Sequence, residues 1–239
     1  MKSLQDFTTA RVALGRAGNS VLTRALLDFQ LAHARARDAV HFPLDIRSLL
    51  ADLEGLKYPC VAAGSAAPDR ATFLRRPDLG RQLKEQSKTV LRPLAGEFDA
   101  VFLAADGLSA LAIHRHAPRM LEILHPLLKP DQWRIGPLVV ITQGRVAIGD
   151  EIGLLLGAAM TVMLIGERPG LSSPDSLGVY VTWNPRPGAT DADRNCISNI
   201  RAEGLGYAAA AHRLLFLMTE GRRRKLTGIR LKEDARLLL

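Results

Sequence analysis

The sequence has few residues of the kinds that mark secreted, membrane or metal-binding proteins. Only two of its 239 residues are cysteines, Cys60 and Cys196, and they form neither a C-x-x-C pair nor a zinc-ligand spacing. Two such cysteines are typical of a reducing compartment, where they stay free. No apolar run reaches the roughly 18 residues that span a bilayer, and the first residues lack the continuous apolar core of a secretory signal. We therefore expect a cytoplasmic protein without a membrane partner.

Clusters of side chains that would hold a metal or form a nucleophilic site are also lacking. His114 and His116 are two residues apart, so they do not share a helix face, and no cysteine or carboxylate cluster at ligand spacing accompanies them. No Ser/His/Asp or Cys/His set stands out. The sequence predicts no metal site.

The charge is strongly positive, with a formal net charge of +8 at pH 7. Such a balance suits an acidic partner, such as nucleic acid, an anionic membrane surface or a phosphate-bearing ligand. The arginines are scattered over many segments and no nucleic-acid-binding motif occurs, so solvated faces and subunit contacts are the preferred interpretation. We expect no nucleic-acid partner.

The first part of the chain, residues 1–97, is predicted to be a helical region. An apolar stripe that includes Leu22, Leu26 and Phe29 predicts an amphipathic helix over residues 21–40, which needs a surface to pack on. Further helices are expected over residues 46–56 and 77–90. Residues 58–72 are rich in Ala, Gly, Ser and Pro and are predicted to have little regular structure.

From residue 98 onward, short apolar runs alternate with helical segments. The runs at residues 100–105, 137–142, 160–165 and 178–183 are predicted strands, and residues 111–124, 150–156 and 203–219 are predicted helices. Runs that are apolar throughout are typical of a parallel sheet covered on both faces. We expect an α/β fold, with a Rossmann-like, doubly wound, mainly parallel sheet over residues 98–239 and the N-terminal helical region beside it.

One motif suggests another function. Gly204, Gly206 and Ala209 match the dinucleotide pattern G-x-G-x-x-A, which requires a preceding strand and an acidic residue about 20 positions later. The segment before it is short and polar, and no acid lies at that distance. We therefore prefer the interpretation that these glycines loosen the start of a helix to the interpretation that they form a nicotinamide site. An NAD(P)-dependent Rossmann oxidoreductase is kept as the alternative, and a binding or scaffold subunit without a cofactor is a third interpretation.

Three residues follow predicted strands at positions where a ligand would be met. Val146 follows the turn after the second strand, Glu167 begins the loop after the third, and Cys196 lies in the polar segment after the fourth. If the sheet is parallel, all three lie toward one rim, where open α/β sheets bind ligands.

Six short blocks, in one order and across most of the chain, resemble the light (small) subunit of adenosylcobalamin-dependent ethanolamine ammonia-lyase. Six blocks in order are hard to produce by chance. The blocks are GRAG at residues 15–18, RPDLGR at 76–81, DGLS at 106–109, GRV at 144–146, GERPGL at 166–171 and DRNCISNI at 193–200.

The resemblance implies a function and a division of labour. The family converts ethanolamine to acetaldehyde and ammonia by a radical mechanism that begins with cobalt–carbon homolysis. Its heavy (large) subunit, which resembles a TIM barrel, holds substrate and the catalytic side chains. This chain would then be part of a hetero-oligomer and would bind the cofactor at the subunit interface, with no catalytic residue of its own.

The resemblance also implies the cofactor site. The family positions that match Val146, Glu167 and Cys196 contact adenosylcobalamin. Arg145 and Arg194 are second candidates, for the phosphate of the nucleotide tail or the propionamide oxygens. No D-x-H-x-x-G motif occurs, so a base-on cofactor, with its own benzimidazole on cobalt, is implied. Some members carry a longer N-terminal extension linked to bacterial microcompartments. This chain starts almost at the shared core, which favours a free cytoplasmic enzyme.

Overall fold

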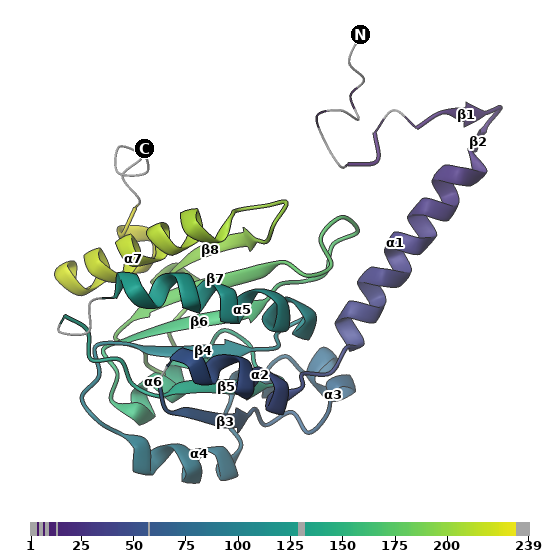
Figure 1. The fold of residues 1–239 in the computed structure, drawn as a ribbon. Helices are drawn as coiled ribbons and strands as arrows, with labels where there is room; N and C mark the ends of the chain where they lie inside the picture. The colour runs from purple at the N-terminus through teal and green to yellow at the C-terminus, as the bar shows by residue number, and fades with distance from the viewer. Residues whose placement is uncertain are drawn as a thin grey trace.

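A six-stranded sheet forms the centre of the computed structural model, which describes residues 4, 7, 10–12, 14–56, 58–128 and 132–232 (Figure 1). The strand order is β3–β5–β4–β6–β7–β8. The first four strands are parallel, β7 runs antiparallel to β6, and β8 runs antiparallel to β7. In chain order the strands are β3 (Cys60–Gly64), β4 (Val101–Ala105), β5 (Leu138–Thr142), β6 (Met160–Gly166), β7 (Leu177–Trp183) and β8 (Arg194–Ile200).

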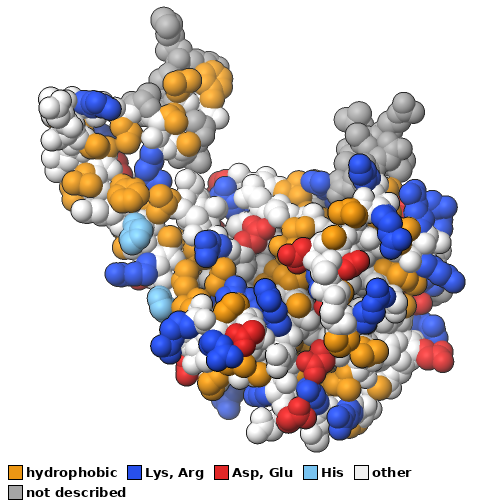
Figure 2. All heavy atoms as spheres, turned by 180° about the vertical axis from the view of Figure 1, so that it is seen from behind, with side chains coloured by type: hydrophobic (Ala, Val, Ile, Leu, Met, Phe, Trp, Pro, Cys, Tyr) orange, Lys and Arg blue, Asp and Glu red, His pale blue; other side chains and the backbone are white. Residues whose placement is uncertain are grey.

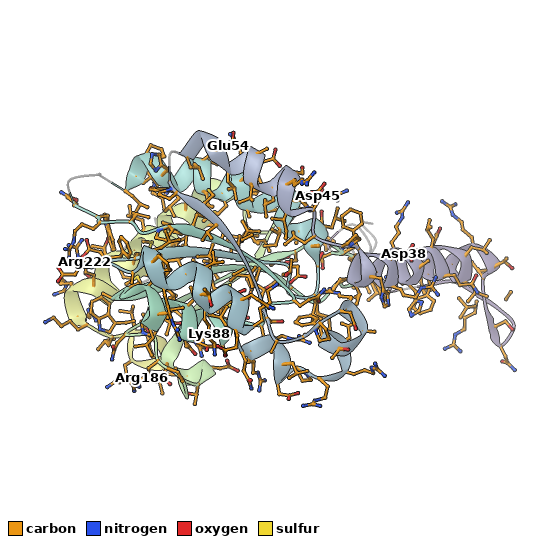
Figure 3. The ribbon with its side chains drawn as sticks, turned by 90° about the horizontal axis from the view of Figure 1, so that it is seen from below. Asp38, Asp45, Glu54, Lys88, Arg186 and Arg222 are labelled. Atoms are coloured by element: carbon orange, nitrogen blue, oxygen red, sulfur yellow. The ribbon has the colours of Figure 1, made fainter. Side chains whose placement is uncertain are left out.

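Helices pack on both faces of the sheet, because successive side chains of a strand point to opposite faces. On one face α2, α5 and α7 cover a core that includes Phe102, Val140 and Leu164. On the other face α4 and α6 cover Leu103 and Ile141. Figure 3 shows the ends of α2 on one side of the sheet and α4 on the other. The helices are α1 (Thr23–His41), α2 (Ile46–Leu53), α3 (Arg70–Arg75), α4 (Glu85–Leu91), α5 (Ala110–Leu124), α6 (Ile148–Leu156) and α7 (Tyr207–Arg224).

Short elements complete the described chain. The strands β1 (Arg16–Ala17) and β2 (Ser20–Val21) form a small antiparallel hairpin. The 3₁₀ turns are η2 (Glu54–Leu56), η3 (Leu79–Arg81), η4 (Arg92–Leu94), η5 (His125–Leu127), η6 (Asp191–Asp193) and η7 (Gly228–Arg230).

Helix α1 extends away from the body, with the β1–β2 hairpin at its far end (Figure 1). The amphipathic helix expected here is confirmed, but its apolar stripe is not covered. Leu26 is 47% exposed and Phe29 41% exposed, and Figure 2 shows hydrophobic side chains at the surface of this projecting part. The stripe therefore lacks a cover within the part of the chain that the structure describes.

The six strands leave part of one face open. On the α6 side, the buried core extends from β3 to β6 and ends against the half-buried Tyr180 of β7. On the same face of β8, Cys196 is exposed. Because β6, β7 and β8 are joined as antiparallel neighbours, no crossover helix is needed between them. The surface of β7 and β8 beside α6 stays uncovered by any helix of residues 14–232 that the structure describes.

The four strands predicted from apolar runs are confirmed as β4, β5, β6 and β7, and the mainly parallel mixed α/β sheet is confirmed with them. The prediction of little regular structure over residues 58–72 is wrong, because Cys60–Gly64 pairs in parallel with β5 as an edge strand. This strand lies within residues 1–97 yet belongs to the central sheet. The division of the chain at residue 97 stays a prediction.

The single helix expected over residues 77–90 is also wrong. The turn η3 is followed by an extended stretch, and α4 begins only at Glu85. The reason is pairing with a distant segment: the N–H of Ala66 donates to the Gln82 carbonyl (2.8 Å), and that of Lys84 donates to the Gly64 carbonyl (3.2 Å). Tertiary hydrogen bonds thus override the local helical preference.

A buried ion pair between Arg70 and Asp106 lies where β4 and β5 end. Asp106 is 2% exposed, and one of its oxygens accepts a hydrogen bond from the Gly144 N–H (3.1 Å). Its other oxygen lies 3.4 Å from Nη1 of Arg70, which also donates to the Gly107 carbonyl. Arg70 Nε donates to the Val40 carbonyl at the end of α1 (2.7 Å). These bonds fix the turn that leads from β5 into α6.

Burial raises the pKa of Asp106 to about 6, although the charge of Arg70 opposes the shift. An unfolded aspartate has a pKa of about 3.9. The folded chain therefore takes up a proton as the pH falls from 7 to 5, and this uptake stabilises it. We expect the stability of the wild type relative to Asp106→Asn to rise by roughly 1 kcal/mol between pH 7 and pH 5, measured by urea unfolding at both pH values. A pH-independent difference between the two proteins would contradict this; Asp191→Asn, at an exposed carboxylate, is the control.

Candidate functional site

A cavity of about 1030 Å³ lies over the uncovered faces of β7 and β8. Its floor contains Tyr180 and Cys196, which lie directly opposite each other on the paired strands. The walls come from residues 77–82, residues 145–151 at the start of α6 and the turn at residues 187–191, together with Lys88 of α4. Figure 2 views the molecule from this side, where charged side chains of both signs lie among hydrophobic ones. The volume is at the upper end for small-molecule sites.

Two of the three residues predicted for the cofactor line this cavity, and the third lies beside it. Val146 comes from the turn after β5 and Cys196 from β8. Glu167 follows β6 directly and approaches Gly178, where a Cβ would lie only 3.0 Å from its Oε1. Gly178 is two residues from Tyr180 and so on the same sheet face. Val146 and Cys196 thus share one lining with Tyr180, and Glu167 is close enough for its charge to act on the Tyr180 hydroxyl.

The expected position of Cys196 is wrong in one respect. It was expected in a polar segment after the last strand, at the rim of a parallel sheet, but it lies in the middle of β8. Since β7 is antiparallel to both of its neighbours, β8 runs in the same direction as β6 and forms the edge strand of the sheet. Cys196 therefore belongs to the floor of the cavity, whereas Val146 and Glu167 follow the carboxyl ends of parallel strands.

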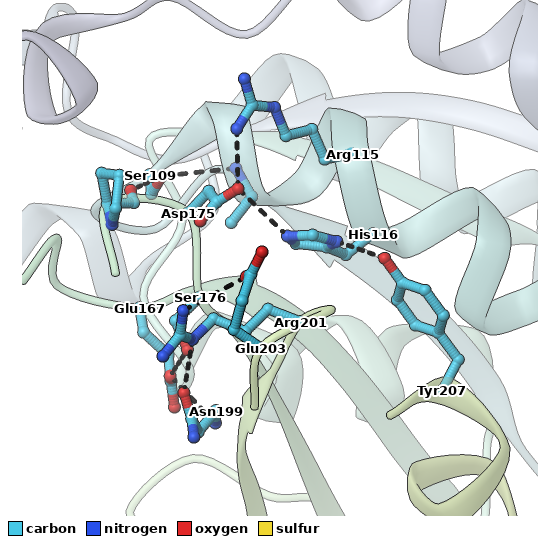
Figure 4. Close-up of polar contacts among 12 residues, drawn as sticks. Ser109, Arg115, His116, Glu167, Asp175, Ser176, Asn199, Arg201, Glu203 and Tyr207 are labelled. Atoms are coloured by element: carbon cyan, nitrogen blue, oxygen red, sulfur yellow. Dashed lines mark hydrogen bonds and ion pairs between the residues drawn. The ribbon is translucent and has the colours of Figure 1, made fainter. Parts of the chain in front are cut away.

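Two hydrogen bonds hold Glu167 in place, one from the residue before β7 and one from β8 (Figure 4). Its Oε2 accepts from the hydroxyl of Ser176, just before β7, and from the backbone N–H of Asn199 in β8 (3.2 Å). Gly178 leaves the room that this carboxylate needs. Glu167 thus joins the ends of β6, β7 and β8 at one edge of the cavity.

Tyr180 is the residue that sequence reasoning missed. Burial raises its pKa, and its contact with the Cys196 thiol and the charge of Glu167 add to the shift, so its hydroxyl stays protonated at neutral pH. The signal was present in the alternation along β7: Leu177, Val179 and Val181 are fully buried, while Tyr180 and Thr182 face the other way. Alternation of this kind is typical of an antiparallel strand with one less-covered face.

Arg194 is held by the protein itself. Two of its guanidinium nitrogens lie 2.7 Å from the two carboxylate oxygens of Asp150, and both side chains are almost fully buried, at 2% and 3% exposed. It also donates to the hydroxyl of Thr182 (3.1 Å) and to the Ala189 carbonyl (3.0 Å). This pair joins α6, β7 and the 187–191 turn. Of the two arginines considered for a cofactor, Arg194 therefore has a structural role.

The histidines and the glycine motif have structural roles as well. His114 accepts a hydrogen bond from the Asp45 N–H at the start of α2 (3.0 Å), and His116 contacts Tyr207 and Asp175 (Figure 4). Within the described ranges no group of three His, Cys, Asp or Glu side chains could hold a metal. Gly204 lies in the tight turn between β8 and α7, at the antiparallel end of the sheet. A dinucleotide site at this motif is not favoured.

A search for membrane spans gives no candidate: none of the helices in the part that the structure describes combines the length and apolarity needed to cross a bilayer.

Comparison with known proteins gives a consistent result over the chain. The family model described as ethanolamine ammonia-lyase light chain (EutC) matches residues 1–232. The ethanolamine ammonia-lyase small subunit of Pseudomonas fluorescens (strain Pf0-1) is 58% identical over 238 residues, which cover 98% of this chain and 87% of that protein. The small subunit of Pseudomonas paraeruginosa (strain PA7) is 55% identical over 236 residues, covering 97% and 86% of the two chains.

The ion pair of Arg194 and Asp150 makes a testable prediction about stability. Arg194→Met leaves the Asp150 carboxylate buried without its partner, so we expect the free energy of unfolding to fall by about 3–5 kcal/mol. The double variant Arg194→Met/Asp150→Leu removes both charges and should recover most of the loss. Urea unfolding measures all three proteins, with Arg186→Met, at an exposed position, as the control. A single variant as stable as the wild type would show that the pair does not hold the 187–191 turn.

Proposed function

Because the chain belongs to the family of ethanolamine ammonia-lyase light chains and is the small subunit of a lyase complex, we propose that its cavity over β7 and β8 binds adenosylcobalamin. One observation carries this proposal: Val146 and Cys196, 50 positions apart in the sequence, line the same cavity, and Glu167 lies against Gly178, two residues from Tyr180 in the floor of that cavity. When bound, the cofactor supplies homolytic cobalt–carbon chemistry for the deamination of ethanolamine to acetaldehyde and ammonia.

The residues present fit a large corrinoid. The cavity has an apolar part, formed by Tyr180 and Val146, next to polar and charged walls. Corrin side chains end in amides, which donate and accept hydrogen bonds. A buried polar atom without a partner, Nε of Arg145, lies in a residue of the same lining. A site of this size and mixed polarity is open enough to receive one face of such a ligand.

Each residue has a distinct role in this proposal. Val146 gives apolar contact, Cys196 is small enough to let the ligand approach the sheet, and Tyr180 lies beside it as part of the floor. Glu167, fixed by Ser176 and Asn199, accepts hydrogen bonds from amide or hydroxyl groups. In this proposal the cofactor is base-on and keeps its own benzimidazole on cobalt.

The small subunit needs a larger partner, and we propose that the heavy subunit supplies the catalytic residues and covers the cofactor from the other side. The uncovered stripe of α1 supports a contact with this partner, since exposed apolar patches mark interaction sites. The free cysteines Cys60 and Cys196 support a place in the reducing cytoplasm. The four parallel strands with helices on both faces support the Rossmann-like, doubly wound classification.

Glu167 gives a direct test of the cofactor site. Glu167→Ala removes an acceptor of hydrogen bonds, so we expect adenosylcobalamin to bind the complex with the heavy subunit about tenfold more weakly, while the fold is kept. Titration followed by visible absorbance measures the affinity. Glu167→Gln, which can still accept from Ser176 and Asn199, should lose less affinity for adenosylcobalamin. Glu203→Ala, at an exposed carboxylate, should keep the affinity of the wild type. An unchanged titration for Glu167→Ala would remove this residue from the site.

The partner surface gives a second test. The double variant Leu26→Asp/Phe29→Asp places two charges on the uncovered stripe of α1, so we expect recovery of the heavy subunit in co-purification to fall at least tenfold. Circular dichroism should show the helix content of the wild type. Gln30→Asp, also at an exposed position of α1, is the matched control. Full recovery with the double variant would exclude this stripe as the main contact.

A further inference from the structure

Two arginines in the cavity lack a carboxylate partner. Among the charged residues of the lining, Arg194 is paired with Asp150, and Lys88 lies 2.9 Å from Glu151. Arg81 and Arg145 line the same cavity but form no ion pair with any residue that the structure describes. Their positive charges are therefore available to a ligand.

Arg145 is held in place by packing. Its backbone N–H donates to the Gly80 carbonyl (2.7 Å), next to Arg81 in the chain. Its guanidinium lies over the ring of Phe73, 4.2 Å from the centroid. A Cβ at Gly80 would come within 2.9 Å of the Arg145 side chain, so glycine is needed for this close approach. The position of the guanidinium is thus fixed before any ligand arrives.

The surroundings of Arg145 are strongly positive. Burial lowers its pKa, and the charges of Arg70 and Arg81 lower it further. The charge of Asp106 acts in the opposite direction, but this carboxylate is already bound to Arg70 and to the Gly144 N–H. Nε of Arg145 is buried without a hydrogen-bond partner. Like charges close together, with one buried donor unused, cost free energy that a bound anion would offset.

We propose that Arg145 and Arg81 form an anion subsite that takes a phosphodiester. A planar guanidinium presents parallel N–H groups that match two phosphate oxygens, and such charge-assisted pairs are among the strongest hydrogen bonds. The identity of the phosphodiester rests on the proposed function: it is the one in the nucleotide tail of adenosylcobalamin. Arg194 does not take this role, because both of its terminal nitrogens already donate to Asp150, and further to Thr182 and Ala189.

Two corrinoids test this subsite. Adenosylcobalamin carries the phosphate-bearing tail, and adenosylcobinamide lacks it. In the complex with the heavy subunit, Arg145→Met should raise the Kd for adenosylcobalamin at least tenfold and leave the Kd for adenosylcobinamide unchanged. Raising the salt concentration from 50 to 300 mM should weaken binding of adenosylcobalamin by the wild type more than by the variant, because salt screens the lost charge interaction. Ultrafiltration with visible absorbance of the retained corrinoid gives each Kd.

A second variant and a control make the result unambiguous. Arg81→Met, at an exposed position, tests the subsite without disturbing the packing on Phe73 and should show the same selectivity. Arg223→Met, which breaks only the surface pair with Glu220, should change neither Kd. Equal loss for both corrinoids, or no loss for either, would overturn the subsite while leaving the cavity as a cofactor site. A wild-type complex that binds neither corrinoid would overturn the proposed function itself.

Discussion

The antiparallel pairing of β7 with β6 is the constraint on which the cavity over β7 and β8 depends. A parallel strand at that place would need a crossover helix, which would cover the sheet on one of its faces. Antiparallel neighbours need only turns, so the face of β7 and β8 beside α6 stays open. The pair of Arg194 and Asp150 then holds the 187–191 turn against α6 and gives this open face a wall.

Local pattern was enough for the elements that are apolar throughout. The buried strands β4, β5 and β6 and helix α5 could all be predicted from the sequence, and Ser109 caps α5 by accepting from the Ala112 N–H (3.3 Å). The strand β3 could not, because its small residues gain their strand structure from pairing with β5. Nor could β8, whose polar residues resemble a loop until β7 is known to lie beside them.

The side chains of the candidate site could likewise not all be predicted from the sequence. Resemblance gave Val146, Glu167 and Cys196, but no spacing along the chain indicates that they meet at Tyr180. Arg145 and Arg194 look alike in the sequence, since Arg145 directly precedes Val146 and Arg194 lies two positions before Cys196. Their partners in the folded chain distinguish them. Arg194 binds the carboxylate of Asp150, 44 positions earlier in the sequence, whereas Arg145 stacks on Phe73. Function is thus decided by partners that only the folded chain brings together.

The projecting helix α1 has a consequence for how the chain is produced in the cell. Its 19 residues form an arm of about 28 Å, at 1.5 Å per residue, with an apolar stripe in contact with water. In a chain without a partner this apolar surface would stay exposed to solvent. Aggregation through it would then compete with correct assembly. A partner that covers this stripe would therefore also lower the tendency of the chain to aggregate.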